Sequence, residues 1–216
     1  MVLAAPPSPP APARSGSLFV VSAPSGAGKT SLVRALLERQ PQMQLSVSFT
    51  TRAARPGEAD GRDYTFVDRS EFERRRLAGE FLEWAEVHGS LYATSRNWIE
   101  RRIAAGVDIV LEIDWQGALQ VQRLYPQAVG VFIAPPSIEV LRERLTVRGQ
   151  DSAAVIERRL DAAEAELKQA HRCQYVIINQ EFARALENLL AIVEAARLRY
   201  VNQKARHPAV FAALGI

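Results

Sequence analysis

The stretch at residues 20–30, VVSAPSGAGKT, constrains this chain more than any other part of its sequence. It continues an unbroken apolar run, residues 18–22, which is typical of a strand covered on both faces. A glycine-rich loop follows, and then apolar residues at helical spacing up to Pro41, which ends the helix. Strand, loop and helix in this order predict a parallel α/β sheet whose first loop holds polyphosphate.

The chemistry of such a loop explains its composition. Polyphosphate is held by inward-facing backbone N–H groups, which require glycine where a side chain would block the approach, here Gly26 and Gly28. Lys29 reaches the β- and γ-phosphate oxygens, and Thr30 offers its hydroxyl to Mg²⁺. Ala23 stands where the pattern G-x-x-x-x-G-K-[ST] has its first glycine. An ordinary strand–helix turn is the alternative, which the flanking strand and helix disfavour.

The rest of the chain also alternates between strands and helices. Further buried strands are expected at 107–113, 128–133 and 175–179, and helices at 97–105, 137–148, 155–172 and 184–204. Only residues 46–92 break this order, because they are rich in turns and in β-forming residues. We therefore predict an α/β fold, a P-loop parallel sheet with flanking helices and a β-rich inserted lobe.

Composition narrows the class of protein. The chain has 216 residues with 48% hydrophobic content, a net charge of +3 and one cysteine. The small charge excess does not call for a nucleic-acid partner, and no apolar run reaches the roughly 18 residues that span a bilayer. Neither a signal peptide nor a disulfide is expected, so we expect a soluble cytoplasmic protein without a membrane partner. Residues 1–17, rich in proline and alanine, are expected to be a disordered tail.

Two acids end the second predicted strand. Alternation in LEIDWQG places Glu112 and Asp114 on the same face, and a carboxylate beside Thr30 suits a Mg²⁺ water shell. Asp114 is the expected metal-side residue. The alternative is an acid that caps the next turn.

Arginines and hydroxyls suit the binding of phosphate groups. Arg144 and Arg148, four residues apart, with Arg159 could neutralise a transferring phosphoryl group; a solvated basic face is the alternative. In the inserted lobe, Arg52 and Arg55 suit a phosphomonoester, because arginine binds phosphate as a bidentate fork.

The motifs together resemble the guanylate kinase family. These are SAPSGAGKT, SFTTRAARPGEADGRDYTFV, GEFLEWAEVHGSLYATS, LEIDWQGA, FIAPPS and RGQDSAAVIERRL, and they cover residues 18–206. The resemblance implies an ATP:GMP phosphotransferase that uses Mg²⁺. It also implies a domain at 18–206 with an NMP-binding lobe at about 46–94 and a helical lid at about 137–159. Residues 207–216 form a C-terminal extension.

The resemblance also implies roles for individual residues. For ATP these are Ser25, Gly26, Ala27, Gly28, Lys29, Thr30 and, near adenine, Asn179. The GMP phosphate is assigned to Arg52, Arg55, Tyr64 and Tyr92, and guanine to Ser48, Glu83, Thr94 and Glu112. The catalytic groups are Lys29, Arg144, Arg148 and Arg159, and the metal-side groups are Thr30 and Asp114.

Two other functions fit parts of this pattern. A non-catalytic peptide-binding module of the same fold would lack an intact ATP loop, whereas this chain retains Lys29 and Thr30. A sugar-phosphate kinase, for example for ribose 1,5-bisphosphate, would not need a carboxylate for guanine, which Glu83 supplies here. Assembly into a homo-oligomer is left open by the sequence.

Overall fold

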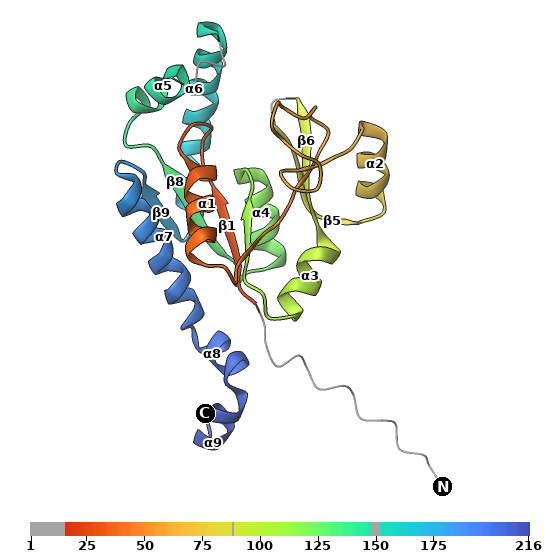
Figure 1. Cartoon of the computed structure of the whole chain (residues 1–216), viewed down its shortest axis with the longest axis vertical. Coiled ribbons are helices and arrows are strands. Elements are labelled where there is room, and N and C mark those ends of the chain that lie inside the picture. Colours follow the sequence, from red (N-terminus) through yellow and green to blue (C-terminus); the bar gives the residue numbers. More distant parts are fainter. Residues whose placement is uncertain (1–15, 88, 148–151) are drawn as a thin grey trace.

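The computed structural model describes residues 16–87, 89–147 and 152–216. A five-stranded sheet in the order β2-β7-β1-β8-β9 lies at its centre, and every neighbouring pair is parallel (Figure 1). Its strands are β1 (Leu18–Ser22), β2 (Gln44–Leu45), β7 (Ile109–Glu112), β8 (Val129–Ala134) and β9 (Tyr175–Ile178). The predicted α/β class is confirmed. The apolar runs located four of these strands, whereas β2 is too short to produce one.

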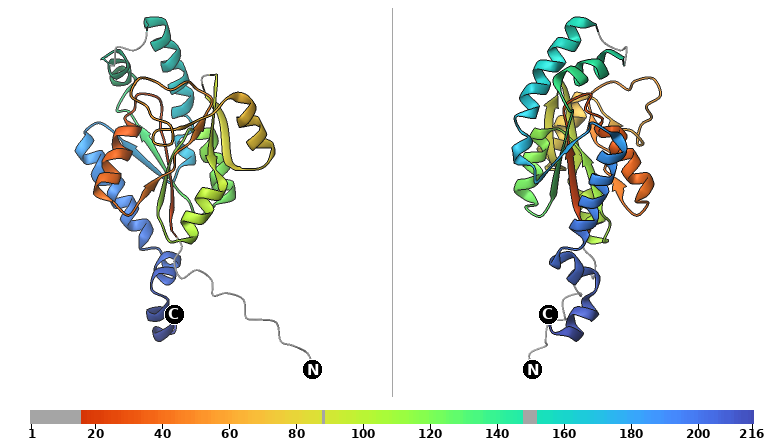
Figure 2. Two further views of the ribbon diagram at one scale, coloured as in Figure 1. Left: turned by 45° about the vertical axis from the view of Figure 1, so that its right-hand side comes forward. Right: turned by 90° about the vertical axis from the view of Figure 1, so that its left-hand side faces the viewer.

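Helices cover both faces of the sheet, as the right-hand view of Figure 2 shows. They are α1 (Lys29–Arg39) and α7 (Phe182–Arg197) on one face, and α3 (Arg96–Ala104) and α4 (Trp115–Leu124) on the other. Strand β1 supplies both layers: Phe19 and Val21 join the core under α1 and α7, and Leu18 and Val20 join the core under α3 and α4. Burial on both faces explains why this strand reads as an unbroken apolar run.

The inserted lobe has its own sheet and its own small core. Its strands run in the order β4-β3-β6-β5, and they are β3 (Phe49–Thr50), β4 (Thr65–Phe66), β5 (Phe81–Val87) and β6 (Ser90–Ser95). Helix α2 (Arg69–Leu77) packs Phe72 against Phe81, Leu91 and Ala93. Strand β5 also contacts α4, where Gln120 Nε2 donates to the carbonyl of Trp84 at 2.7 Å. The lobe is therefore fixed to the sheet through α4.

Helices α5 (Ile138–Val147) and α6 (Ala153–Leu167) form a further unit at the carboxyl ends of the strands (Figure 1). Their facing residues make a separate apolar cluster of Leu141, Leu145, Ile156, Leu160 and Ala163. We name this pair the lid helices. The name follows the lid that the resemblance predicts at about 137–159, and movement of this pair stays a prediction.

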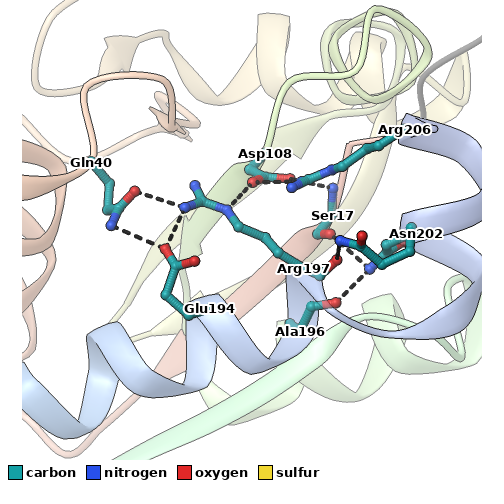
Figure 3. A network of polar contacts seen from close by, with 9 residues as sticks. Ser17, Gln40, Asp108, Glu194, Ala196, Arg197, Asn202 and Arg206 are labelled. Carbon is teal, nitrogen blue, oxygen red and sulfur yellow. Dashed lines mark hydrogen bonds and ion pairs between the residues drawn. The ribbon is translucent and has the colours of Figure 1, made fainter.

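A buried aspartate fastens the opposite end of the sheet (Figure 3). Asp108, 5% exposed, accepts hydrogen bonds from the Ser17 amide at 2.8 Å and from Arg197 Nε at 2.8 Å. It also accepts one from Arg206 Nη2 at 3.0 Å. These contacts join the starts of β1 and β7 to α7 and to α8 (Tyr200–Arg206).

Several helices differ from the sequence predictions. The single helix expected at 184–204 is wrong, because it is divided into α7 and α8 at Leu198 and Arg199, where Asn202 Nδ2 donates to the Ala196 carbonyl at 2.7 Å. The helix expected at 155–172 ends at Leu167, and a 3₁₀ turn, η1 (Ala170–Arg172), follows. Helices α2, α4 and α9 (Pro208–Leu214) were not expected at all. None of the helices in the described ranges is long and apolar enough to cross a membrane.

Candidate active site

The loop between β1 and α1 has the geometry that phosphate binding needs. Gly26 and Gly28 adopt φ angles of 91° and 94°, which side chains disfavour, and Gly28 caps the first turn of α1. The amides at this helix start then face an incoming anion, and the helix dipole favours negative charge there. Ala23 is buried in the main core, so its methyl group packs inward at the position of the missing glycine.

Asn179 and Arg144 hold this loop from the side of the lid helices. Asn179 Nδ2 donates to the carbonyl of Ala27 at 2.8 Å, and the Asn179 side chain lies close against the Cα of Gly28. Arg144 Nη2 in turn donates to the Asn179 carbonyl at 2.8 Å. Arg144 Nη1 is buried and is the side-chain atom recorded without a partner in the described part of the chain. A buried guanidinium nitrogen beside a phosphate loop is chemically matched to an anionic ligand.

The carboxylate in contact with Thr30 is that of Glu112. Thr30 Oγ1 donates a short hydrogen bond to Glu112 Oε1, and Lys29 Nζ donates to the carbonyl of Ile113 at 3.2 Å. The end of β7 is thereby joined to the start of α1. A hydroxyl and a carboxylate in contact supply the oxygen ligands that Mg²⁺ prefers.

Asp114 has a different position from the one that the sequence pattern suggested. Strand β7 ends at Glu112, so the alternation stops before Asp114, which becomes the N-cap of α4. Asp114 Oδ1 accepts from the Gly117 amide at 3.0 Å, and Oδ2 accepts from Gln116 Nε2 at 3.1 Å. Asp114 therefore caps the next turn, as the alternative reading had it, and the carboxylate beside Thr30 is that of Glu112 and not that of the expected metal-side residue Asp114.

Glu83 is a carboxylate buried in the lobe–α4 contact, 3% exposed. It faces Thr94 across the β5–β6 pair, and Thr94 Oγ1 donates to Glu83 Oε1 at 2.6 Å. Burial raises the pKa of Glu83 to about 7; the hydrogen bond from Thr94 opposes this rise, and the charge of Asp114 adds to it. Glu83, on the lobe, and Asp114, at the start of α4, therefore interact electrostatically.

Arg52, Tyr64 and Tyr92 gather on one side of the lobe. The Arg52 guanidinium lies 5.3 Å from the centroid of the Tyr64 ring, and the Tyr64 and Tyr92 rings meet edge to face at 6.0 Å. Burial raises the pKa of Tyr64, and the charge of Glu112 adds to the rise. A cation and two phenol hydroxyls that lie together are suited to bind an anion.

Ser25 and Ser48 are half-buried, Arg55 is exposed, and Arg159 lies on α6. Arg148 lies outside the described residues.

Sequence reasoning missed two acids at this site. Glu58 pairs bidentately with Arg52 Nη2, at 2.8 and 2.9 Å, which lowers the pKa of Glu58 and raises that of Arg52. Glu166, on α6, has a pKa raised to about 7 by burial; Lys29 lowers it and Asp114 raises it. The position of Glu58 in the turn RPGE, six residues after Arg52, was a usable signal. Glu166 follows no motif, and only the packing of α6 brings it near Lys29.

Comparison with known proteins decides the family. A family model described as guanylate kinase matches residues 15–196. A curated guanylate kinase of Bordetella pertussis is 58% identical over 204 residues, covering 94% of this chain and 95% of the relative.

The chain belongs to the guanylate kinase family. A guanylate kinase of Dechloromonas aromatica is also 58% identical, over 91% of this chain and 97% of its own length. The crystal structure of a guanylate kinase from Anaplasma phagocytophilum superposes with a TM-score of 0.73 at 35% identity, over 90% of this chain and 96% of that chain. The match to the guanylate kinase model ends at residue 196, so α8 and α9 lie beyond it.

Proposed function

We propose that this chain transfers the γ-phosphoryl group of ATP to the phosphate of GMP, giving ADP and GDP, with dGMP as a further acceptor. The family assignment supports this reaction. The structural observation that supports GMP as the acceptor is the buried carboxylate of Glu83. Thr94 donates a hydrogen bond to it, and the charge of Asp114 acts on it. A sugar phosphate does not present two parallel N–H donors to such a carboxylate, whereas guanine does.

On the donor side, the amides from Gly26 to Thr30 hold the ATP phosphates, and Lys29 follows the β- and γ-oxygens. The buried Nη1 of Arg144 is free of protein partners and lies on the lid side of the loop. In this proposal it meets negative charge that develops during transfer, together with Arg148 and Arg159.

On the acceptor side, Arg52, Arg55, Tyr64 and Tyr92 hold the GMP phosphate in line with the donor. Arg52 must then exchange or share its pairing with Glu58. A GMP phosphate oxygen attacks the γ-phosphorus, the bond from that phosphorus to the β,γ-bridging oxygen breaks, and ADP leaves with that oxygen. Positioning and neutralisation of charge supply most of the catalysis.

Guanine recognition is assigned to Glu83, Thr94 and Ser48, with Asp114 as a second acceptor in place of Glu112. Guanine presents N1–H and N2–H donors side by side, and a carboxylate accepts two parallel donors well. Adenine presents an acceptor at N1, which a carboxylate repels. Asp114 takes this role because Asp114 Oδ1 and Glu83 Oε2 both border Gly117, whereas Glu112 contacts Thr30 beside the phosphate loop.

Mg²⁺ is the proposed cofactor, on the side of Thr30 and Glu112. Within the described ranges no cluster of three or more His, Cys, Asp or Glu side chains could hold a metal by itself. This suits Mg²⁺, which keeps several waters and binds through one or two carboxylates and substrate phosphates. The ion, when bound with ATP, neutralises charge on the phosphate oxygens.

An assay of ADP release tests the proposal. The acceptors are GMP, dGMP, AMP, CMP and ribose 1,5-bisphosphate, with and without Mg²⁺. We expect turnover with GMP and dGMP that needs Mg²⁺, at a kcat/KM far above that for AMP. Turnover with the sugar phosphate alone would favour the sugar-phosphate kinase, and no turnover with any acceptor would favour the peptide-binding module.

Location and assembly complete the proposal. A cytoplasmic location suits the free thiol of Cys173, because reducing compartments keep thiols unpaired. Assembly into a homo-oligomer is tested by light scattering of the eluted protein at several concentrations.

A further inference from the structure

Gly117 occupies a position where a side chain would meet the two acids of the proposed base site. A Cβ built on Gly117 would collide with Glu83 Oε2, with the Cδ of the same side chain at 3.0 Å. Asp114 Oδ1 would lie 3.4 Å from that Cβ. Both carboxylates thus lie against the bare Cα of one residue in the first turn of α4.

Backbone conformation does not explain this glycine. Gly117 lies inside regular helix with a negative φ, and alanine is the better helix former at such a position. By contrast, Gly57 and Gly79 have φ angles of 88° and 71° and open space around them, so backbone conformation alone explains those two. What Gly117 supplies is space, and the Glu83 carboxylate fills it.

The absence of a side chain at Gly117 also determines how the Glu83 side chain is oriented. Thr94 holds Oε1 from the lobe side, and the missing side chain at 117 lets Oε2 rest on α4 beside Asp114. A methyl group there would have to push the carboxylate away, because the backbone of α4 is fixed by the Asp114 cap. Thr94 and Asp114 would keep their positions while the acid between them moved.

We infer that Gly117 is a specificity-determining positioning residue, which holds Glu83 in register for the guanine edge by leaving room for its carboxylate. This inference rests on the proposed role of Glu83 in reading the base. Gly117 itself need not touch the substrate.

The test begins with Gly117→Ala, measured for kcat and KM with GMP and with AMP, for ATP binding, and for thermal unfolding. We expect kcat/KM for GMP to fall on the order of 10- to 100-fold, as for a displaced charge-assisted hydrogen bond. The loss should appear mainly in KM for GMP, and the GMP:AMP ratio should fall. ATP affinity should hold, and Tm should be unchanged or higher because alanine favours the helix. Arg123→Ala, an exposed change on the same helix, is the matched control and should leave all these values unchanged.

A double-mutant cycle separates positioning from direct obstruction of the base. In a Glu83→Ala background the carboxylate is gone, so adding Gly117→Ala should change GMP kinetics little. Glu83→Asp, one methylene shorter, should restore part of the GMP:AMP ratio when combined with Gly117→Ala. An equal loss from Gly117→Ala with and without Glu83 would overturn the inference, because the methyl group would then act on the substrate itself.

The outcomes also distinguish a failure of this inference from a failure of the proposed role of Glu83 in base recognition. If Glu83→Ala keeps the wild-type GMP:AMP ratio, the proposed role of Glu83 fails and the inference fails with it. If Glu83→Ala lowers the ratio but Gly117→Ala does not, only the positioning role of Gly117 is overturned. A Tm drop in Gly117→Ala that Glu83→Ala does not relieve would place the defect in the helix, which also overturns it.

Discussion

The Glu83→Gln substitution tests base recognition with little change of shape. Gln keeps the size of the side chain and one acceptor, so Thr94 can still donate to it. It replaces the second acceptor with an NH₂ donor, which opposes the guanine donors and suits the N1 acceptor of adenine. The substitution therefore alters the direction of one hydrogen bond at a site that is 3% exposed.

The magnitude follows from the burial of Glu83. A hydrogen bond to a charged group contributes about 1.5–3 kcal/mol, and here a donor would face a donor without water between them. Since about 1.4 kcal/mol is tenfold, kcat/KM for GMP should fall on the order of 10- to 1,000-fold. The value for AMP should stay level or rise, so the GMP:AMP ratio should fall by at least the same factor.

The pH dependence supplies a second measurement on the same variant. Burial raises the pKa of Glu83 to about 7, so the ionised form that accepts two donors prevails only above that pH. In the wild type, kcat/KM for GMP should therefore rise as pH increases through about 7, and Glu83→Gln should lack this rise. The unfolded chain, with a pKa of about 4.5, binds fewer protons than the folded one between pH 4.5 and 7. The contribution of Glu83 to stability should therefore decline as pH rises through that window, by about 3 kcal/mol at most. Gln should remove this contribution and leave the one that Glu166 makes in the same window, so the decline should become shallower.

The assays are steady-state ADP release with GMP and with AMP between pH 5.5 and 8.5, and urea unfolding over the same range. An unchanged GMP:AMP ratio in Glu83→Gln would refute the role of Glu83 in reading the base. An unchanged slope of stability with pH would refute the argument from burial, whatever the kinetics show.

Four further predictions follow from the site and the fold. Lys29→Met should abolish turnover and leave the unfolding midpoint unchanged, so wild-type kcat would remove Lys29 from the mechanism. Arg144→Ala should lower kcat more than it weakens GMP binding, because its buried nitrogen meets charge that grows in the transition state; a pure KM effect would contradict this. Asp108→Ala should lower the free energy of unfolding by about 3–5 kcal/mol, because it removes the buried carboxylate that accepts from the Ser17 amide, Arg197 and Arg206. Glu194→Ala, which removes an exposed partner of Arg197, should cost less than about 1 kcal/mol, and equal losses would contradict the reasoning. Saturating GMP with a non-hydrolysable ATP analogue should reduce the radius of gyration in small-angle scattering as the lid helices close, and an identical radius would count against closure.

The loop and the sheet could be predicted because their signals are local. Residues 18–30 carry an apolar run, two glycines and a helix start in sequence, and the structure follows that order. Helix α4 was not predicted, although Ala118 and Val121 are buried at helical spacing and Asp114 caps its start, so its signal was present in the sequence. Helix α2 was missed because one buried residue, Phe72, gives no periodicity to count.

Glu112 and Asp114 show how far the alternation of side chains along a strand can be used for prediction. Alternation holds while the strand continues, and β7 stops at Glu112. Asp114 then obeys the rules of a helix start, where an aspartate side chain accepts from the backbone amide three residues on. The Glu83–Thr94 pair needs the pairing of β5 with β6, and the approach of Glu166 to Lys29 needs the packing of α6; neither is encoded by spacing along the chain.

The chain's last helix lies at the far pole of the molecule from the lid helices and the lobe (Figure 1). Helix α9 has no buried residue, and its contacts are chiefly with α8. A linker added after Ile216 can therefore anchor the protein to a sensor surface without covering the strand ends where both substrates are proposed to bind. Attachment through this end gives all molecules the same orientation on the surface. An optical measurement of film thickness would then report domain closure directly.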